Sequence, residues 1–304
     1  MIQVDHLTRR YGPTTAVNDV SFSIERGEVV GLLGHNAAGK TTIMKMLTGY
    51  LEPTAGTIRV DNLSMGRDTR AIQARIGYLP ENCPVWPEMT VIDYLDYQAT
   101  LHGVSDDRRE KAVADAIRRT QLKEKAADTI ETLSRGYRQR VGVAQALLHD
   151  PDIIILDEPT NGLDPTQIRQ MRDLIQELAQ SATVIVSTHI LQEVQAVCER
   201  VLILRAGELI LDSRLDELQQ SSGLWVETDG AATESLHQVE GVRAMEDLGD
   251  EEGRRLYLLD ADPETAPAVA EAVTNAGRQL FTLQPRRRDL ETLFAEINEE
   301  VAHG

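Results

Sequence analysis

The stretch that decides the fold is EVVGLLGHNAAGKTTIMKMLTG, residues 28–49. Residues 28–33 are mostly apolar and predict a short buried strand, whereas residues 43–49 place apolar side chains at helical spacing. Between them lies the loop GHNAAGKTT, residues 34–42, which begins with one glycine and contains a second. The order is therefore strand, glycine loop, helix.

The loop fits the pattern G-x-x-x-x-G-K-[ST] at Gly34, Gly39, Lys40 and Thr41. In this pattern backbone N–H groups wrap phosphates, the lysine meets the β and γ oxygens, and the hydroxyl holds Mg²⁺. The helix that follows adds the positive end of its dipole. We predict an ATP and Mg²⁺ site here, and the other loop residues expected in it are Asn36, Ala37, Ala38 and Thr42.

A second chemical element is IIILDE, residues 153–158, where an apolar strand ends in two carboxylates. Asp157 would reach the Mg²⁺ shell, and Glu158 would lie beside the γ-phosphate, able to orient and deprotonate a water molecule. The alternative is that these acids merely end a strand.

The remaining apolar runs outline the fold as α/β. Strands are expected at 153–157, 183–188 and 200–211, with helices between them, for example at 165–180. This alternation predicts a mostly parallel sheet covered on both faces.

Two regions depart from this alternation. Residues 88–150 are helical without strands and predict an inserted helical subdomain. After about residue 213, short strands (LWVETD, RRLYLLD, QLFTLQP) mix with helices (PETAPAVAEAVTNAG, RDLETLFAEINEEVA). We therefore predict two domains, residues 1–215 and a small α+β domain at 216–304.

Net charge is −18 and is unevenly distributed, with 22 acids and 9 bases in residues 205–304. Such a field opposes phosphate backbones, so no nucleic-acid partner is expected, and a merely solvated acidic face is the favoured explanation of the charge. The two cysteines, Cys83 and Cys198, have no metal-like or redox-like neighbours and are expected as thiols.

No apolar run approaches the roughly 18 residues of a membrane span. The first ten residues, MIQVDHLTRR, lack the apolar stretch of a secretory signal, so export is not expected.

A second segment with the chemistry of an anion site is LSRGYRQR, residues 133–140, where Ser134 and Gly136 precede a predicted helix. Read alone, it is equally a serine-capped helix start. Together with the other motifs, however, it resembles the signature segment of the ATPase subunits of ATP-binding-cassette (ABC) transporters. The resemblance covers residues 1 to about 215 and rests on five stretches in the family's order: 34–42, 133–139, 153–158, 162–164 and 187–189.

The resemblance implies a P-loop cassette fold, with an antiparallel edge on the parallel core, that works as a head-to-tail dimer of two copies. Ser134 and Gly136 of one copy would contact the γ-phosphate held by Lys40 of the other, and Arg135 would add charge nearby. Asp164 matches the acid of the loop that links the two sites.

Three further positions carry over from the family. Tyr11 matches the adenine-stacking aromatic, although a lone tyrosine is also consistent with packing. His189 matches the histidine that hydrogen-bonds the γ-phosphate, although it also fits a satisfied polar group at a strand end. Glu81 stands where the family has a glutamine, and its carboxylate can ligate Mg²⁺ while adding negative charge.

Other positions depart from the family's pattern. His35 and Ala37 replace the usual proline and glycine, and if position 37 needs a positive φ, its β-carbon costs about 1 kcal/mol. Arg135 and Tyr137 stand where glycine and glutamine are commoner. These features look like those of cassettes that serve type-2 exporters.

The expected function is thus an ATP-hydrolysing motor, cytoplasmic and peripheral on the inner face of the cell membrane, with separate permease subunits as partners. A permease helix is expected to dock near residues 78–97, on apolar groups that would otherwise be subdomain core: Cys83, Val85, Trp86, Tyr94 and Tyr97. Two alternatives remain: an ABC ATPase acting on ribosomes or DNA, and a regulatory module that binds nucleotide without turnover because of Ala37 and Glu81.

Overall fold

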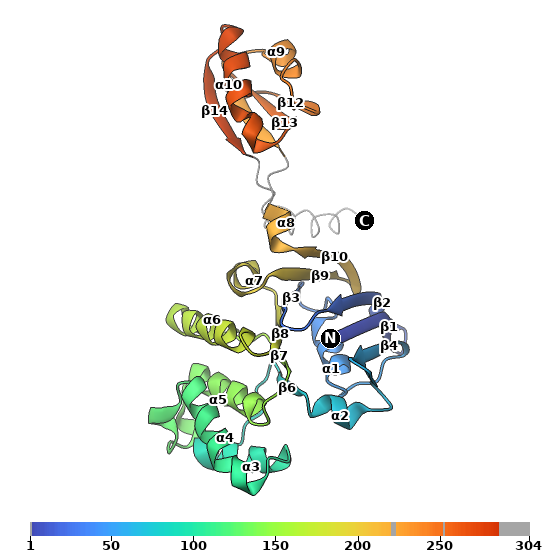
Figure 1. Cartoon of the computed structure of the whole chain (residues 1–304), viewed down its shortest axis with the longest axis vertical. Coiled ribbons are helices and arrows are strands. Elements are labelled where there is room, and N and C mark those ends of the chain that lie inside the picture. The colour runs from blue at the N-terminus through green and yellow to red at the C-terminus, as the bar shows by residue number, and fades with distance from the viewer. Residues whose placement is uncertain (1, 220–222, 252, 286–304) are drawn as a thin grey trace. The chain divides into compact units, whose positions relative to one another are not determined.

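The computed structural model describes residues 2–219, 223–251 and 253–285. The chain folds as two compact units, Met1–Leu215 and Asp216–Gly304, shown in Figure 1. Each unit has its own apolar core.

The first unit is built on a six-stranded sheet in the order β10-β9-β3-β8-β7-β6. Its strands are β3 (Val29–Leu33), β6 (Ile76–Leu79), β7 (Ile153–Asp157), β8 (Thr183–Thr188), β9 (Arg200–Arg205) and β10 (Glu208–Arg214). All neighbouring strands are parallel except β9 and β10. Every residue of β3, β7 and β8 is buried, as expected for strands covered on both faces. The predicted mostly parallel sheet with an antiparallel edge is confirmed.

The prediction of one strand at residues 200–211 is wrong, because two strands occupy this segment. The chain reverses at Ala206 and Gly207, whose φ angles are 49° and 86°. Two consecutive positive φ values define the type I′ turn that joins two antiparallel strands. The segment is therefore the hairpin of β9 and β10.

A second, antiparallel sheet was not singled out from the sequence. It runs β2-β1-β4-β5, with strands β1 (Ile2–Tyr11), β2 (Thr14–Ile24), β4 (Ala55–Val60) and β5 (Leu63–Ser64). Helix α1 (Lys40–Leu47) buries Ile43, Met44 and Met46 in the core that the two sheets share. This burial on both sides fixes the start of α1, and with it the glycine loop.

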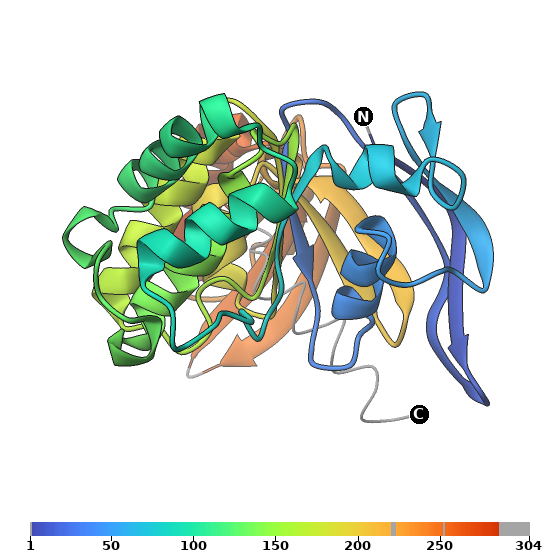
Figure 2. The same ribbon diagram turned by 90° about the horizontal axis from the view of Figure 1, so that it is seen from below.

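The inserted helical group comprises α3 (Val91–Leu101), α4 (Asp106–Arg119) and α5 (Arg135–Leu147), with short 3₁₀ turns at Lys123–Lys125 and Ile130–Thr132. It has its own core. Figures 1 and 2 show this green group and the blue antiparallel sheet on the two sides of the central strands. The unit is completed by α2 (Thr69–Gln73), α6 (Pro165–Ala179) and α7 (Leu191–Val197).

The second unit holds an antiparallel sheet in the order β12-β13-β11-β14. Its elements are β11 (Leu224–Thr228), α9 (Thr233–His237), β12 (Ala244–Glu251), β13 (Arg254–Asp260), a 3₁₀ turn (Pro263–Thr265), α10 (Ala266–Asn275) and β14 (Leu280–Pro285), preceded by α8 (Leu215–Gln219). The order is that of a split β-α-β motif. The sequence did not predict β12, because AMEDLGDE lacks apolar alternation; the helix predicted at 288–302 lies outside the described residues.

Within the part of the chain that the structure describes, no helix is long and apolar enough to span a membrane.

Candidate nucleotide site

The glycine loop connects the buried end of β3 to the start of α1, and both motif glycines are required by close backbone contacts. A β-carbon on Gly34 would lie 2.6 Å from the carbonyl oxygen of Leu204. Gly39 has φ 105°, and a β-carbon there would lie 2.6 Å from the carbonyl oxygen of Ala16. Only glycine fits both places, which is the physical content of the G-x-x-x-x-G spacing.

Lys40 points back into the loop. Its Nζ donates to the carbonyl oxygens of Gly34 at 2.6 Å and His35 at 3.2 Å. The same Nζ lies 3.5 Å from Oε1 of Glu158, and both side chains are almost fully buried. The ammonium is thus held inside the loop. Its attraction to an anionic ligand there would be little screened by solvent.

Ala37 occupies the left-handed region, with φ 67°. Position 37 therefore does adopt a positive φ, and the β-carbon of Ala37 costs about 1 kcal/mol in this conformation.

Glu158 and His189 are brought together because β7 and β8 are parallel neighbours and end at the same edge of the sheet. Glu158 Oε2 and His189 Nδ1 share a hydrogen bond of 2.9 Å. The glutamate backbone is strained, with φ 50°, and is held by a bond from its N–H to the carbonyl oxygen of Ser187 at 2.9 Å. The carboxylate therefore stands between the Lys40 ammonium and an imidazole.

Asp157, the last residue of β7, is fully buried. Neither of its carboxylate oxygens has a hydrogen-bond partner, and the buried hydroxyl oxygen of Ser187 also lacks one. Burial raises the pKa of Asp157, an effect that the nearby hydroxyls of Ser187 and Thr41 oppose. Unpartnered oxygens of this kind fit a divalent cation, since carboxylate and hydroxyl oxygens are the ligands that Mg²⁺ accepts.

Of these groups, Lys40, Ala37 and Glu158 line a cleft of about 630 Å³, the phosphate cleft, whereas Asp157 and His189 are not among its lining residues. Its walls combine Thr14, Thr15 and Ala16 of β2 with the loop residues His35, Asn36, Ala37, Ala38, Gly39, Lys40, Thr41 and Thr42, and with Glu81, Glu158 and Ala206. Glu81 and Glu158 thus line the same cleft from different elements. Sequence reasoning missed the β2 wall, because no chemistry-bearing pattern marks two threonines and an alanine.

Tyr11 lies outside the residues that line this cleft. It is 46% exposed at the end of β1, and the guanidinium of Arg9 lies 4.7 Å from the centre of its ring. It lines a neighbouring groove together with Lys45 and Tyr50. Its adenine-stacking role stays a prediction.

The predicted signature residues form a second, separate surface. Ser134 caps α5, and its hydroxyl accepts from the N–H of Tyr137 at 3.4 Å, so the predicted helix start is confirmed. Asp164 caps α6, and its carboxylate accepts from two backbone N–H groups at 2.9 Å. The two caps are packed together, because a β-carbon on Gly136 would meet the Gln167 side chain at 2.5 to 2.8 Å.

Arg135 lies against the same junction, since a β-carbon on Gly162 would meet its guanidinium at 2.5 Å. Ser134, Arg135 and Asp164 are exposed. None of them lines the phosphate cleft of their own chain.

The neighbouring groove has a volume of about 530 Å³. It is lined by Tyr11, Lys45, Tyr50, Leu51, Tyr78, Leu79, Pro80, Cys83, Pro84, Gly142 and Gln145. Trp86, in the segment before α3, and Tyr97 of α3 are exposed, with ring centres 4.8 Å apart, and neither lines this groove. Val85 packs against the helical core.

Tyr94 does not belong to a docking surface. It is 1% exposed, and its hydroxyl donates to the side chain of Gln145 and to the carbonyl oxygen of Pro84. Residues three apart lie close together on a helix surface, so it is the packing of α3 and not its spacing that buries Tyr94 and leaves Tyr97 exposed.

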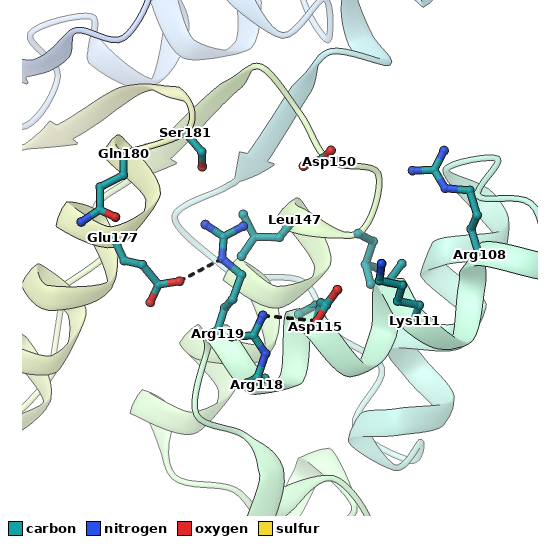
Figure 3. A pocket seen from close by; sticks show the side chains of 13 residues that line it. Arg108, Lys111, Asp115, Arg118, Arg119, Leu147, Asp150, Glu177, Gln180 and Ser181 are labelled. Atoms are coloured by element: carbon teal, nitrogen blue, oxygen red, sulfur yellow. Dashed lines mark hydrogen bonds and ion pairs between the residues drawn. The ribbon is translucent and has the colours of Figure 1, made fainter.

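A further hollow of about 530 Å³ lies along α4, between it and the C-terminal ends of α5 and α6 (Figure 3). Two of the arginines that line it form ion pairs with other lining residues: Arg118 with Asp115, and Arg119 with Glu177. It has no glycine loop, and we do not assign a ligand to it.

Comparisons with known proteins agree with this geometry. The sequence profile of the family described as "ABC transporter" matches residues 17–161. The chain is 38% identical over 227 residues to the "ABC transporter ATP-binding protein NatA" of Bacillus subtilis (strain 168), covering 73% of this chain and 92% of that protein. It is 33% identical over 229 residues to the "Bacitracin transport ATP-binding protein BcrA" of Bacillus licheniformis, covering 75% and 74%.

Among solved structures, a dimeric post-hydrolysis state of the ATP-binding cassette MJ0796 bound to ADP and Pi superposes with a TM-score of 0.65 at 25% identity. The superposition covers 71% of this chain and 99% of that one.

Proposed function

This chain belongs to the ATPase subunits of ABC transporters and hydrolyses ATP, and from that premise we propose how its own residues do so and what they drive. The observation that carries the proposal is the cluster of Lys40, Glu158 and His189 beside the unpartnered carboxylate of Asp157.

In the proposed chemistry Lys40 offsets the charge of the β- and γ-phosphate oxygens. Glu158 orients a water molecule and accepts its proton as the water oxygen attacks the γ-phosphorus and the bond to ADP breaks. His189, whose Nδ1 is bonded to Glu158, presents its other ring nitrogen toward the γ-phosphate. Mg²⁺, held by Thr41, Asp157 and Glu81, would supply charge neutralisation on the phosphate oxygens.

The proposed working form is a head-to-tail dimer. Ser134 and Arg135 are exposed on the first turn of α5, whereas Gly136 is buried against the side chain of Gln167. None of the three lines the cleft of its own chain. Placed by a second copy, they complete the γ-phosphate site with a serine hydroxyl, a backbone N–H at a helix start and a guanidinium. Asp164, packed beside them, links the two sites.

The test is the variant Glu158→Gln, which keeps the shape of the side chain and removes the base. We expect turnover to fall by roughly 10² to 10⁴, the usual scale for a general base. Because ATP then persists, light scattering at saturating Mg-ATP should find a stable dimer. A variant that hydrolyses ATP at the normal rate, or that stays monomeric both alone and with its permease, contradicts the proposal.

We further propose that the partners are separate permease subunits at the inner face of the cell membrane, and that the transport is export. The relative BcrA is named for bacitracin transport. The exposed aromatic pair of Trp86 and Tyr97 offers an apolar surface to a permease helix. Trp86→Ala with Tyr97→Ala should reduce membrane recruitment while leaving the ATPase activity of the isolated chain unchanged. Unchanged recruitment would argue against this surface.

A further inference from the structure

A buried carboxylate lies just outside the cleft and takes no part in the chemistry described above. Glu193 of α7 is 3% exposed. One of its oxygens accepts a hydrogen bond from the Thr160 hydroxyl. The other accepts from the Thr188 hydroxyl at 2.9 Å.

The two threonines lie next to the two proposed hydrolytic residues: Thr160 is in the loop after β7, and Thr188 is the last residue of β8. Thr160 follows Glu158 by two residues, and Thr188 directly precedes His189. The Thr188 hydroxyl also accepts the N–H of Ile190 at 3.1 Å, so it is bonded on both sides. Glu193 therefore connects the loop after β7 to the end of β8, and this link is separate from the Glu158–His189 bond.

The arrangement is not explained by charge pairing. Among the described residues, no lysine or arginine lies within ion-pair distance of Glu193. Burying a carboxylate without a cation is costly, and an apolar side chain of similar size usually serves stability as well. A carboxylate, in contrast, has two acceptor oxygens and can bind two hydroxyl donors from two separate segments at once.

The loops need such a restraint because one of them is strained. Glu158 has φ 50°, a conformation that a residue with a β-carbon keeps only when its surroundings determine it. A displacement of about 1 Å in a catalytic group can lower a rate about a hundredfold.

We propose that Glu193 is a positioning residue for ATP hydrolysis: it clamps Thr160 and Thr188 so that Glu158 and His189 keep their hydrogen bond and face the γ-phosphate. This inference rests on the proposed roles of Glu158 and His189. It adds a residue that neither binds nucleotide nor touches the reacting atoms.

The first experiment compares kcat with nucleotide affinity in the full chain. Glu193→Ala should lower kcat about 10- to 100-fold, with the Kd for Mg-ATP changed by less than about twofold, because the glycine loop is untouched. Glu193→Gln keeps the side-chain shape and one acceptor oxygen, and its amide N–H can donate to the other threonine hydroxyl, so both links persist and most of kcat should be recovered. The matched control is Gln195→Ala, an exposed position on the same helix, which should leave both constants unchanged.

The second experiment separates positioning from a general structural role by a double-mutant cycle. If Glu193 acts through the Glu158–His189 pair, Glu193→Ala should have little further effect on kcat in a His189→Ala background. Independent, additive effects overturn the proposal, as does a rise in Kd with unchanged kcat.

Two further outcomes are decisive. If Glu193→Ala does not fold, Thr160→Val removes one donor at constant volume, and unchanged kcat in that variant overturns the proposal. Normal turnover by Glu158→Gln refutes the proposed hydrolytic mechanism itself, whereas a normal Glu193→Ala alongside an inactive Glu158→Gln refutes only the clamp.

Discussion

The phosphate cleft and the signature surface, made by Ser134, Arg135, Gly136 and Asp164, differ in how their polar atoms are satisfied. In the cleft, both oxygens of Asp157 lack partners. On the signature surface, the side chains of Ser134 and Asp164 are bonded to the first backbone N–H groups of α5 and α6.

The strain is distributed in the same way. Ala37 and Glu158, with φ 67° and 50°, both lie at the cleft. A buried polar group without a partner costs about 1 to 3 kcal/mol, so the cleft holds unfavourable energy that a ligand can relieve. The side chains of Ser134 and Asp164 on the signature surface show no such deficit. In the proposed dimer, the cleft would thus be completed by its ligand, whereas the signature surface would act as a pre-formed face.

The largest effect is expected when the two surfaces are inactivated in different copies. Lys40→Ala removes the ammonium of the cleft, and Ser134→Glu places a like charge beside the phosphates, so each chain alone should lose hydrolysis about 100-fold or more. In an equal mixture about half of the dimers are mixed, and each of these has one intact composite site. ATPase assays of the mixture should therefore recover about a quarter of the wild-type rate.

The matched control mixes Lys40→Ala with a chain that carries both substitutions, where no dimer has an intact site. Recovery in that mixture, or none in the complementary one, would show that the two surfaces do not meet across a dimer.

Asp157→Asn should change activity and stability in opposite directions. The amide removes the buried charge and can donate to the unpartnered oxygen of Ser187, so we expect the protein without Mg²⁺ to gain about 1 to 2 kcal/mol. That gain corresponds to about 2 to 4 °C in Tm for each kcal/mol. Turnover should fall about 100-fold, because a carboxylate ligand is lost. A lower Tm would mean that Asp157 is already satisfied within the protein.

The cleft side of this comparison was largely predictable from sequence because its determinants are local. Gly34, Gly39 and Lys40 have fixed spacing, and Asp157 and Glu158 follow a continuous apolar strand. Parallel strands end at one edge of a sheet, so their terminal residues meet without further information.

What was missed depends on contacts between distant segments. The acceptor role of Glu193 needs two threonines from two other loops, and only the fold brings these together. Whether Tyr94 or Tyr97 faces the core follows from how α3 packs, which its periodicity alone does not determine. The turn at Ala206 and Gly207 was hidden because apolar residues continue on both sides of it.

Ser134→Ala should have a moderate effect of a different kind. Loss of the cap on α5 is expected to lower the free energy of unfolding by about 1 kcal/mol. Loss of a hydroxyl aimed at a phosphate should weaken the ATP-dependent dimer about tenfold, without changing the ATP affinity of the single chain. The control is Thr90→Ala, which removes a comparable cap from α3. If that variant weakens the dimer equally, helix stability and not phosphate contact is responsible.

The smallest effect is expected at Ala37, and it measures how much of the strain in the cleft matters to function. Ala37→Gly relieves about 1 kcal/mol of left-handed strain but adds a backbone entropy cost of about 0.5 to 1 kcal/mol. The free energy of unfolding, measured with urea, should therefore change by less than about 0.5 kcal/mol. Ala37→Val, which is β-branched, should lose both stability and ATP affinity, because its side chain disfavours positive φ more strongly. An Ala37→Gly chain with markedly tighter ATP binding would mean that the alanine holds the loop away from its binding conformation. The strain at position 37 would then regulate ATP binding and would not be a requirement for assembling the site.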